Sequence, residues 1–584
     1  MAAMTGGELV ARMLAAEGVD TVFGIIDGTY FGFYSSLRKV GITLITPRHE
    51  STALHMAGAY SRATGRLGVA MASNGPGVAN ALPGVAVEQG EGHRVLLITS
   101  ARRTGISYPE RGGTFQYFDQ VASISGMSKQ SQAVPSHERV PEMLRRALRT
   151  SFTGRPGVVH IDIPENIMNT DSPYGEGEIR PPHTYRRVTR TAADAAQVQQ
   201  VADMLLRAQR PLIHSGFGAI HASAFDEVRE VAEVLGAPVV TSWAGRGILP
   251  ESHPQMVAMP FIEANKALRN NADLVMVLGS RVGETDWWGK APYWGRPGQT
   301  HTIQVDIDDA TLGGTRAIDV AVLADIKVFM GALLVELQRR TPASRQSDTW
   351  SAMIAEQRAS LAKKASKPVK HGLHPGKVAG SMQGLVPSDS LWVFDGGNTA
   401  VWSHFYHRTS GVNTVFTTFK FGMLGAGVGQ ALGVQVAHPD RRVVALMGDG
   451  AMGMHPQEIE TAVRNHLPVI FVVFVDQQWG MVKMNQQFAL KPVKTVTKKM
   501  LSNSALGPEE TINADLGPIR WDEMARAMGG FGAYVSRDGE LEPAVGEALA
   551  SGKPAIIHVE VDPVVHMWAP ALRDFKDMHG EPKG

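Results

Sequence analysis

The sequence lacks cysteine, an excess of either charge, and any apolar run long enough to cross a bilayer. The absence of cysteine excludes disulfides, cysteine-ligated zinc or iron–sulfur clusters, and thiolate nucleophiles. Lys and Arg number 57 against 56 Asp and Glu, so the formal net charge of +1 argues against a general nucleic-acid binder. The longest strongly apolar run, 467–475, is too short for a membrane span, and no basic segment followed by an apolar one opens the chain. We therefore expect a cytoplasmic protein without nucleic-acid or membrane partners.

Short apolar runs alternate with segments of helical period along the chain. At about 150 residues per domain, 584 residues predict three to four domains. Strands are expected at 21–23, 42–45, 67–72, 95–99, within 154–166, and at 211–214, 238–241, 274–278, 302–307, 391–394, 443–447, 469–475 and 555–561. This alternation predicts an α/β protein of doubly wound parallel sheets. We expect units at 1–175, 190–345 and 370–563, polar linkers between them, and a tail at 564–584.

The first and third units resemble each other in sequence. Both close on a similar segment, Gly-Arg-Pro-Gly-Val-Val-His-Ile-Asp at 154–162 and Gly-Lys-Pro-Ala-Ile-Ile-His-Val-Glu at 552–560. Both also contain a basic residue, an apolar strand, a glycine-rich turn and a further strand at similar spacing. The order of these features predicts two copies of one fold around a different middle domain.

The most informative segment for chemistry is 441–482. One apolar strand runs into Gly448-Asp449-Gly450, an amphipathic helix follows, and a second buried strand ends at Asp476. Because parallel strands bind ligands at their carboxyl ends, Asp449 and Asp476 are expected to converge there. Two carboxylates suit Mg²⁺, with a diphosphate completing its coordination, and the glycines let the backbone approach phosphates closely.

These motifs resemble those of thiamine-diphosphate-dependent decarboxylases and carboligases of the acetolactate synthase type (acetohydroxyacid synthase large subunits), over almost the whole chain. The family's cofactor motif is Gly-Asp-Gly, a helix and strand, then Asn-Asn; here Val475-Asp476 replaces the asparagines. The resemblance implies thiamine diphosphate and Mg²⁺ as cofactors, with Asp449, Asp476 and the carbonyl of Gln478 as metal ligands. It also implies a pyrimidine-binding first unit and a diphosphate-binding third unit.

Further motifs match the family in order and assign roles by resemblance. Glu50, in Arg-His-Glu, would bond N1′ of the aminopyrimidine, Leu424 would prop the bent cofactor, and the carbonyl of Gly422 would orient its amino group. The remaining cofactor residues implied are Asn74, Pro76, Asn80, Gly397, Asn398, Thr399, Gly448, Gly450, Ala451, Met452, Trp479, Gly480 and Met481. Glu50, Phe115, Gln116 and Trp479 are the candidate catalytic residues, and Asp27, Gly28, Thr29, Tyr30 and Asn485 the candidate substrate pocket.

The resemblance implies a reaction class more firmly than a substrate. It implies decarboxylation of a 2-oxo acid to an enamine, which is then transferred to an aldehyde or ketone. Phe115-Gln116 favours acetolactate synthase-like carboligation, whereas Lys483-Met484-Asn485 lacks the tryptophan of the branched-chain biosynthetic enzymes. The alternatives are a 2-hydroxyacyl or benzoin-type lyase, a sulfoacetaldehyde acetyltransferase-like enzyme, and a non-catalytic oligomeric scaffold derived from the family. Asp27 is open between a pocket carboxylate and a turn residue.

Three further expectations concern assembly, flavin and the tail. In the family, the counterparts of Glu50 and Asp449 come from different subunits, which implies a homodimer or homotetramer with the active site at the interface. Gly279-Ser280-Arg281 and Asp306-Ile307-Asp308 match positions where some members bind FAD, but Gly216-Phe217-Gly218 lacks the third glycine of a dinucleotide fingerprint, so FAD is disfavoured. The segment 566–580 is either a lid over the active site or a packed surface helix.

Overall fold

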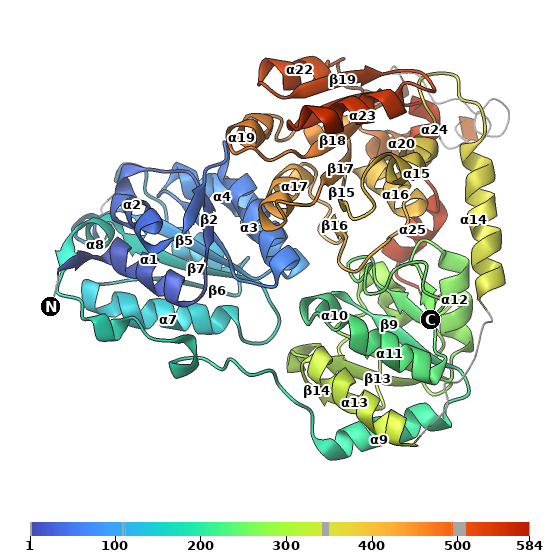
Figure 1. The fold of residues 1–584 in the computed structure, drawn as a ribbon, viewed down its shortest axis with the longest axis horizontal. Helices are drawn as coiled ribbons and strands as arrows, with labels where there is room; N and C mark the ends of the chain where they lie inside the picture. The colour runs from blue at the N-terminus through green and yellow to red at the C-terminus, as the bar shows by residue number, and fades with distance from the viewer. Residues whose placement is uncertain are drawn as a thin grey trace.

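The computed structural model describes residues 3–107, 110, 112–340, 350–491, 493–494 and 510–582. Its backbone forms three six-stranded sheets, all parallel, and a two-stranded antiparallel pair, β1 (Met4–Thr5) with β8 (Asp171–Ser172) (Figure 1). Among the described residues, no helix combines the length and apolarity that a bilayer span requires. The predicted α/β class with doubly wound parallel sheets is confirmed.

The first sheet, blue in Figure 1, has the strand order β3-β2-β4-β5-β7-β6. Its strands are β2 (Thr21–Gly24), β3 (Thr43–Ile45), β4 (Gly68–Ala72), β5 (Val95–Ala101), β6 (Gln130–Ala133) and β7 (Val158–Pro164). Its helices are α1 (Gly6–Ala16), α2 (Phe31–Leu37), α3 (Glu50–Thr64), α4 (Pro76–Glu91), α5 (Thr104–Ser107), α6 (Gln120–Ser125), α7 (Val140–Ser151) and α8 (Glu165–Asn169). Helix α3 begins where the His49 ring accepts a hydrogen bond from the Ser51 amide, and it ends at Gly65, whose φ of 72° is left-handed.

The middle sheet has the order β11-β10-β9-β12-β13-β14, which differs from the first. Its strands are β9 (Pro211–Ser215), β10 (Val239–Thr241), β11 (Met256–Val257), β12 (Leu274–Leu278), β13 (His301–Asp306) and β14 (Val320–Leu323). Its helices are α9 (Ala195–Arg207), α10 (Phe217–His221), α11 (Phe225–Leu235), α12 (Ile262–Asn271) and α13 (Ile326–Arg340), and α14 (Ser351–Ala365) leads onward.

The third sheet has the order β16-β15-β17-β18-β20-β19. Its strands are β15 (Leu391–Asp395), β16 (Val415–Thr417), β17 (Val443–Gly448), β18 (Ile470–Val475), β19 (Phe531–Val535) and β20 (Ala555–Glu560). Its helices are α15 (Pro375–Leu385), α16 (Gly397–Tyr406), α17 (Ala426–Ala437), α18 (Asp449–Met452), α19 (Glu458–Arg464), α20 (Gly480–Leu490), α22 (Trp521–Ala527) and α23 (Leu541–Ser551), followed by α24 (Pro563–Met567) and α25 (Leu572–His579).

The first and third sheets share one topology. Counting strands from the first of each unit, both have the order 2-1-3-4-6-5, whereas the middle sheet has 3-2-1-4-5-6. The prediction of two like units around a different middle domain is therefore confirmed. The segment between the first and middle sheets, where a polar linker is expected, forms β8 and two short 3₁₀ turns, Glu176–Glu178 and Pro182–Thr184.

The first and third units meet where α3 packs along α17 (Figure 1). This contact is close because α17 turns glycines toward α3. A Cβ added at Gly433 would lie 2.3 Å from the carbonyl oxygen of Met56, and one at Gly429 would lie 2.8 Å from Cβ of His55. Apolar residues of both units join in one buried core, which includes Leu54, Val428 and Leu432. Since Glu50 begins α3, this packing fixes its position relative to the third unit.

Candidate functional site

Three strands of the third sheet end in polar or glycine-rich turns at the same edge. β15 ends at Asp395 and is followed by Gly396, β17 ends at Gly448 before Asp449, and β18 ends at Val475 before Asp476. The order of the strands reverses between β15 and β17, which is where open parallel sheets bind ligands. Gly396 has a φ of 90°, and the Asp395 carboxylate accepts hydrogen bonds from the amides of Gly396, Gly425 and Gly427, so it fixes the turns around the edge.

A cavity of about 250 Å³ opens at this edge. It is lined by Gly396, Gly397, Asn398, Thr399, Gly422, Leu424, Gly448, Asp449, Gly450, Ala451, Asp476, Gln478, Trp479, Gly480, Met481, Val482 and His566. The structure thus brings together every predicted cofactor residue of the third unit except Met452, which is buried behind the cavity in α18.

Asp449 is buried beside a second carboxylate. Its Oδ1 accepts from the amide of Gly450 and its Oδ2 from the amide of Gln477, both at 2.9 Å. Burial, and then the nearby charge of Asp476, raise the pKa of Asp449 to about 7. A cation between the two carboxylates would remove this electrostatic cost, so the site suits a metal ion.

Asp476 has partners that the sequence motifs do not indicate. Its Oδ2 lies 2.7 Å from Nδ1 of His566 and 3.0 Å from Nε2 of Gln478. Nε2 of His566 lies 3.0 Å from Oγ1 of Thr399. His566 belongs to α24, within the segment interpreted as lid or surface helix, and no motif in the sequence singles it out.

The residues present suit a metal–diphosphate group. Within the described ranges, no three His, Asp or Glu side chains are arranged to hold a metal by themselves. A metal ion bound by Asp449 and Asp476 would therefore need main-chain and diphosphate oxygens to complete its coordination. The amide oxygen of buried Asn398 has no hydrogen-bond partner in the structure. A Cβ at Gly450 would lie 2.6 Å from the Trp479 ring, so the ring packs directly against the Gly448–Gly450 turn.

A second cavity, of about 380 Å³, adjoins the first and is mostly apolar. It shares Gly396, Gly397, Gly422, Leu424 and Met481 with the first cavity and also contacts Asn485, the predicted pocket residue of the third unit. Helix α25 forms one wall of this cavity through Leu572, Phe575 and Met578.

Helix α25 is fastened to the middle domain. Its Phe575 stacks on Trp243 with ring centroids 5.6 Å apart, and the hydroxyl of Tyr293 donates to Asp577 at 3.2 Å. His579 pairs with Glu284 at 2.6 Å. The tail therefore lines the cavity and packs on another domain. Its action as a lid over the active site stays a prediction.

The predicted residues of the first unit gather at a different place. Nδ2 of Asn80 donates to Glu50 at 3.1 Å, and Nδ2 of Asn74 donates to the carbonyl oxygen of Gln116 at 3.3 Å. Pro76 begins α4 directly after Gly75, and the Phe115 side chain is 72% exposed. In the part of the chain that the structure describes, none of these residues lines either third-unit cavity.

The substrate-pocket candidates at 27–30 form a capped turn. The Asp27 carboxylate accepts from the amide of Thr29 at 2.8 Å and from its hydroxyl at 2.6 Å. A Cβ added at Gly28 would meet no other atom within 4 Å. Tyr30 lies in the core of the first unit and donates to the carbonyl oxygen of Ile25. The structure thus gives Asp27 a turn-forming role and buries Tyr30.

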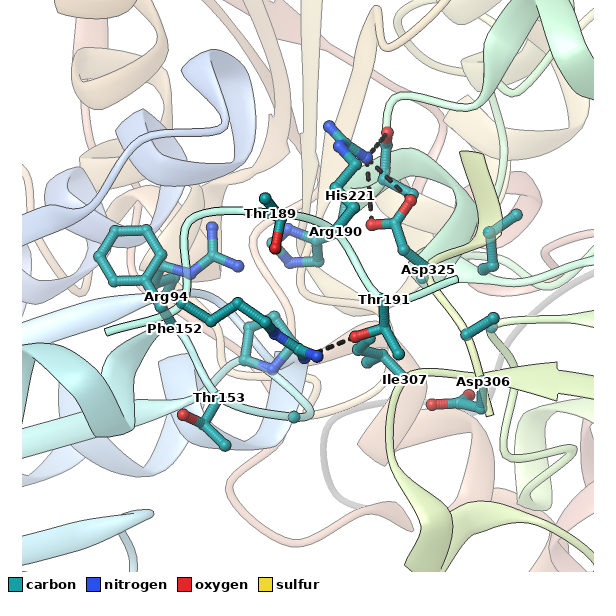
Figure 2. A pocket seen from close by; sticks show the side chains of 18 of the residues that line it. Arg94, Phe152, Thr153, Thr189, Arg190, Thr191, His221, Asp306, Ile307 and Asp325 are labelled. Carbon is teal, nitrogen blue, oxygen red and sulfur yellow. Dashed lines mark hydrogen bonds and ion pairs between the residues drawn. The ribbon is translucent and has the colours of Figure 1, made fainter. Parts of the chain in front are cut away.

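Figure 2 shows a third cavity, of about 290 Å³, where the first unit, the linker and the middle sheet meet. Of the predicted flavin positions, Gly279, Asp306 and Ile307 line it. Its arginines include Arg94, Arg187 and Arg190, and Arg190 bonds both oxygens of Asp325 at 3.0 and 3.1 Å. Burial raises the pKa of Asp306 to about 6. Flavin binding here stays a prediction.

Comparison with known proteins covers all three units. Models of the thiamine pyrophosphate enzymes match residues 4–123 (N-terminal TPP binding domain), 198–333 (central domain) and 395–559 (C-terminal TPP binding domain). The acetolactate synthase isozyme 3 large subunit of Escherichia coli (strain K12) is 28% identical, and the two sequences align over 98% of this chain and 97% of that protein. A sulfoacetaldehyde acetyltransferase of Alcaligenes xylosoxydans xylosoxydans is 29% identical, and the two sequences align over 95% of this chain and 93% of that protein.

These matches follow the order of the three sheets, and the cavity at the edge of the third sheet lies within the C-terminal match apart from His566. The chain belongs to the family of thiamine pyrophosphate-dependent enzymes.

Proposed function

We propose that this enzyme uses Mg²⁺ with thiamine diphosphate to decarboxylate a 2-oxo acid and pass the remaining acyl unit to an aldehyde or ketone. The observation that carries the proposal is the single cavity in which Asp449, Asp476 and the glycine turns of the third sheet converge. The acetolactate synthase and sulfoacetaldehyde acetyltransferase relatives support a transferase or lyase of this kind.

The residues of the cavity divide into metal, diphosphate and ring positions. Asp449, Asp476 and the carbonyl of Gln478 would hold Mg²⁺, while the turn at 396–399 and the N-terminus of α16 would receive the diphosphate. Leu424 would support the bend of the cofactor, and Gly422 would accept from its amino group. Bound thiamine diphosphate would supply the reactive carbanion and the electron sink.

A second copy of the chain would complete the site. Glu50, Phe115 and Gln116 lie apart from both third-unit cavities, and Phe115 exposes most of its ring. Glu50 would hold the proton exchanged at N1′, which requires the first unit of one copy to face the third unit of another. We infer a homodimer, or a tetramer of two such dimers.

The apolar cavity beneath α25 would receive the substrates. Its lining of Phe419, Phe421 and Met484 favours carbon substituents, and Asn485 supplies a polar contact. With α25 in place this wall would exclude water from the reaction. The second candidate is a sulfoacetaldehyde acetyltransferase-like reaction, which the relative of that name favours.

Cofactor binding and a substrate screen test the proposal. Because Trp479 lines the cavity, its fluorescence should change when thiamine diphosphate binds, and only with Mg²⁺ present. Asp449→Asn is the control and should lose the metal-dependent change. The loaded enzyme is then given pyruvate, glyoxylate, sulfoacetaldehyde and aromatic 2-oxo acids, and CO₂ and coupled products are followed. Metal-independent binding, or binding without release of CO₂ from any 2-oxo acid, would contradict the proposal.

A further inference from the structure

Asp476 occupies a position where the resemblance leads one to expect asparagine. Both donors that reach it, Nδ1 of His566 at 2.7 Å and Nε2 of Gln478 at 3.0 Å, bond the same oxygen, Oδ2. No described residue donates to Oδ1. The Asp476 and His566 side chains are 3% and 4% exposed, so water contributes little to this arrangement.

An asparagine would present the opposite polarity to these partners. A carboxylate only accepts hydrogen bonds, whereas the amide nitrogen of asparagine only donates. With its oxygen directed to a metal, an asparagine would direct its NH₂ group toward the two donors that now contact Oδ2. Asp476 therefore accepts the hydrogen bonds that His566 and Gln478 can donate. Because both donors bond Oδ2, only Oδ1 is left without a hydrogen bond from a described residue.

His566 is itself held in a fixed orientation. Because Asp476 can only accept, Nδ1 must carry a proton, and in the neutral ring Nε2 then accepts from the hydroxyl of Thr399 at 3.0 Å. The main-chain carbonyl of His566 accepts from Nε1 of Trp402 at 2.9 Å. Asp562 caps the start of α24 through the amides of Val564 and Val565. The ring is thus anchored from α16 and from its own helix.

We propose that His566 is a positioning residue for the metal: with Gln478 it holds Oδ2 of Asp476 and leaves Oδ1 for Mg²⁺. This inference rests on the proposed function. Partners that orient metal ligands typically contribute about 10- to 100-fold in metal affinity. The competing explanation is that His566 only packs α24 against the sheet, where its ring lies 6.1 Å from that of Phe474.

A double-mutant cycle on Mg²⁺ affinity separates the two explanations. Protein with excess thiamine diphosphate is titrated with Mg²⁺ as the wild type, His566→Phe, Asp476→Asn and the double variant. Phe keeps the ring volume but removes the donor, so His566→Phe should weaken Mg²⁺ binding about 10- to 100-fold. In the Asp476→Asn background, His566→Phe should alter Mg²⁺ affinity by less than about threefold. Asparagine has a single side-chain oxygen, so His566 no longer decides which oxygen faces the metal.

Two further variants keep the result interpretable. His566→Asn places an amide nitrogen near the position of Nδ1, so it should recover most of the affinity lost in His566→Phe. His558→Phe removes another buried histidine of the same unit, which pairs with Glu560 at 3.2 Å, and should leave Mg²⁺ affinity unchanged. Wild-type affinity in His566→Phe, equal losses in both backgrounds, or no recovery in a folded His566→Asn would overturn the inference. Absence of Mg²⁺-dependent cofactor binding in the wild type would instead count against the proposed function.

Discussion

Carboxylates of this protein experience very different surroundings residue by residue. Asp449 is buried beside Asp476, whereas Glu88 lies fully buried between His55 and His93, and burial raises its pKa. Glu50 contacts Asn80 at the start of a helix. A carboxylate's chemistry therefore depends on its donors and neighbours.

Replacing the proposed proton carrier should abolish turnover without unfolding the protein. Glu50→Gln keeps the size of the side chain but cannot hold an exchangeable acid proton, and positioned proton transfer contributes about 10²- to 10⁴-fold in rate. We expect a loss of at least about 100-fold in kcat with metal-dependent cofactor binding retained. Glu547→Gln, an exposed change in α23, is the control. Turnover within threefold of the wild type would rule out the role.

Asp162 should make stability depend on pH. Burial raises its pKa to about 7 from an ordinary value of 3.8, although Thr99 and Gln120 donate to its Oδ1 at 2.5 and 2.8 Å. The folded state thus holds this proton more tightly than the unfolded chain. Its stabilising contribution is complete below about pH 3.8 and is lost as the pH rises through about 7.

Asp162→Asn keeps the accepting oxygen and removes this titration. Thermal unfolding between pH 4 and 8 should show the wild-type midpoint falling relative to that of the variant as the pH rises. Asp440→Asn, which removes an exposed carboxylate, serves as the control. A difference between Asp162→Asn and the wild type that is constant with pH would disprove the assignment.

At the scale of secondary-structure elements, the contact of α3 with α17 leaves no room for a side chain at Gly433. Gly433→Ala would place a Cβ 2.3 Å from the Met56 carbonyl oxygen, and overpacking of this kind costs about 1–3 kcal/mol. Gly546→Ala in α23 meets nothing within 4 Å and should stabilise by about 0.5–1 kcal/mol. Unfolding midpoints should therefore shift in opposite directions. A rise in both variants would show that α17 can move away from α3 at no cost.

Removal of the tail helix α25 tests its role in the wall of the apolar cavity. A chain ending at Ala569 removes α25 but retains His566, so cofactor binding should persist while formation of the coupled product falls, because the apolar cavity loses one wall. A chain ending at Gly580 keeps the helix and is the control. Equal loss of binding and of product would assign α25 a purely structural role.

Sequence patterns located the central strands and, of the edge strands of the three large sheets, only β3. Each buried run such as 274–278 or 443–447 lies in a strand, because strands covered on both faces need continuous apolar residues. The unpredicted strands of the three large sheets, β6, β11, β14, β16 and β19, all lie at sheet edges, where strands are short or partly exposed, and the two-residue strands β1 and β8 were not predicted either. Likewise the motifs indicated Asp449 and Asp476, but His566 reaches the site only because α24 packs against the third sheet, and no local pattern specifies that packing.

At the scale of the whole molecule, the separation of Glu50 from the third-unit cavities predicts complementation between inactive chains. Glu50→Gln and Asp449→Asn are each expected to be inactive as homodimers. In a mixed dimer, one site would receive both substitutions and the other neither. Subunits exchanged at equal amounts should therefore recover about a quarter of wild-type activity. No recovery, despite mixed dimers detected by mass, would place both residues of a site in one chain.

The packing of α3 on α17 also affects how the protein unfolds. One apolar core contains side chains of the first and third sheets, and another extends from the middle sheet to Trp402 of α16 and Met578 of α25. The boundaries of cooperative unfolding therefore cross those of the sheets. A fragment carrying the first sheet alone would expose the apolar face of α3, and we expect it to aggregate unless the third sheet is supplied in trans.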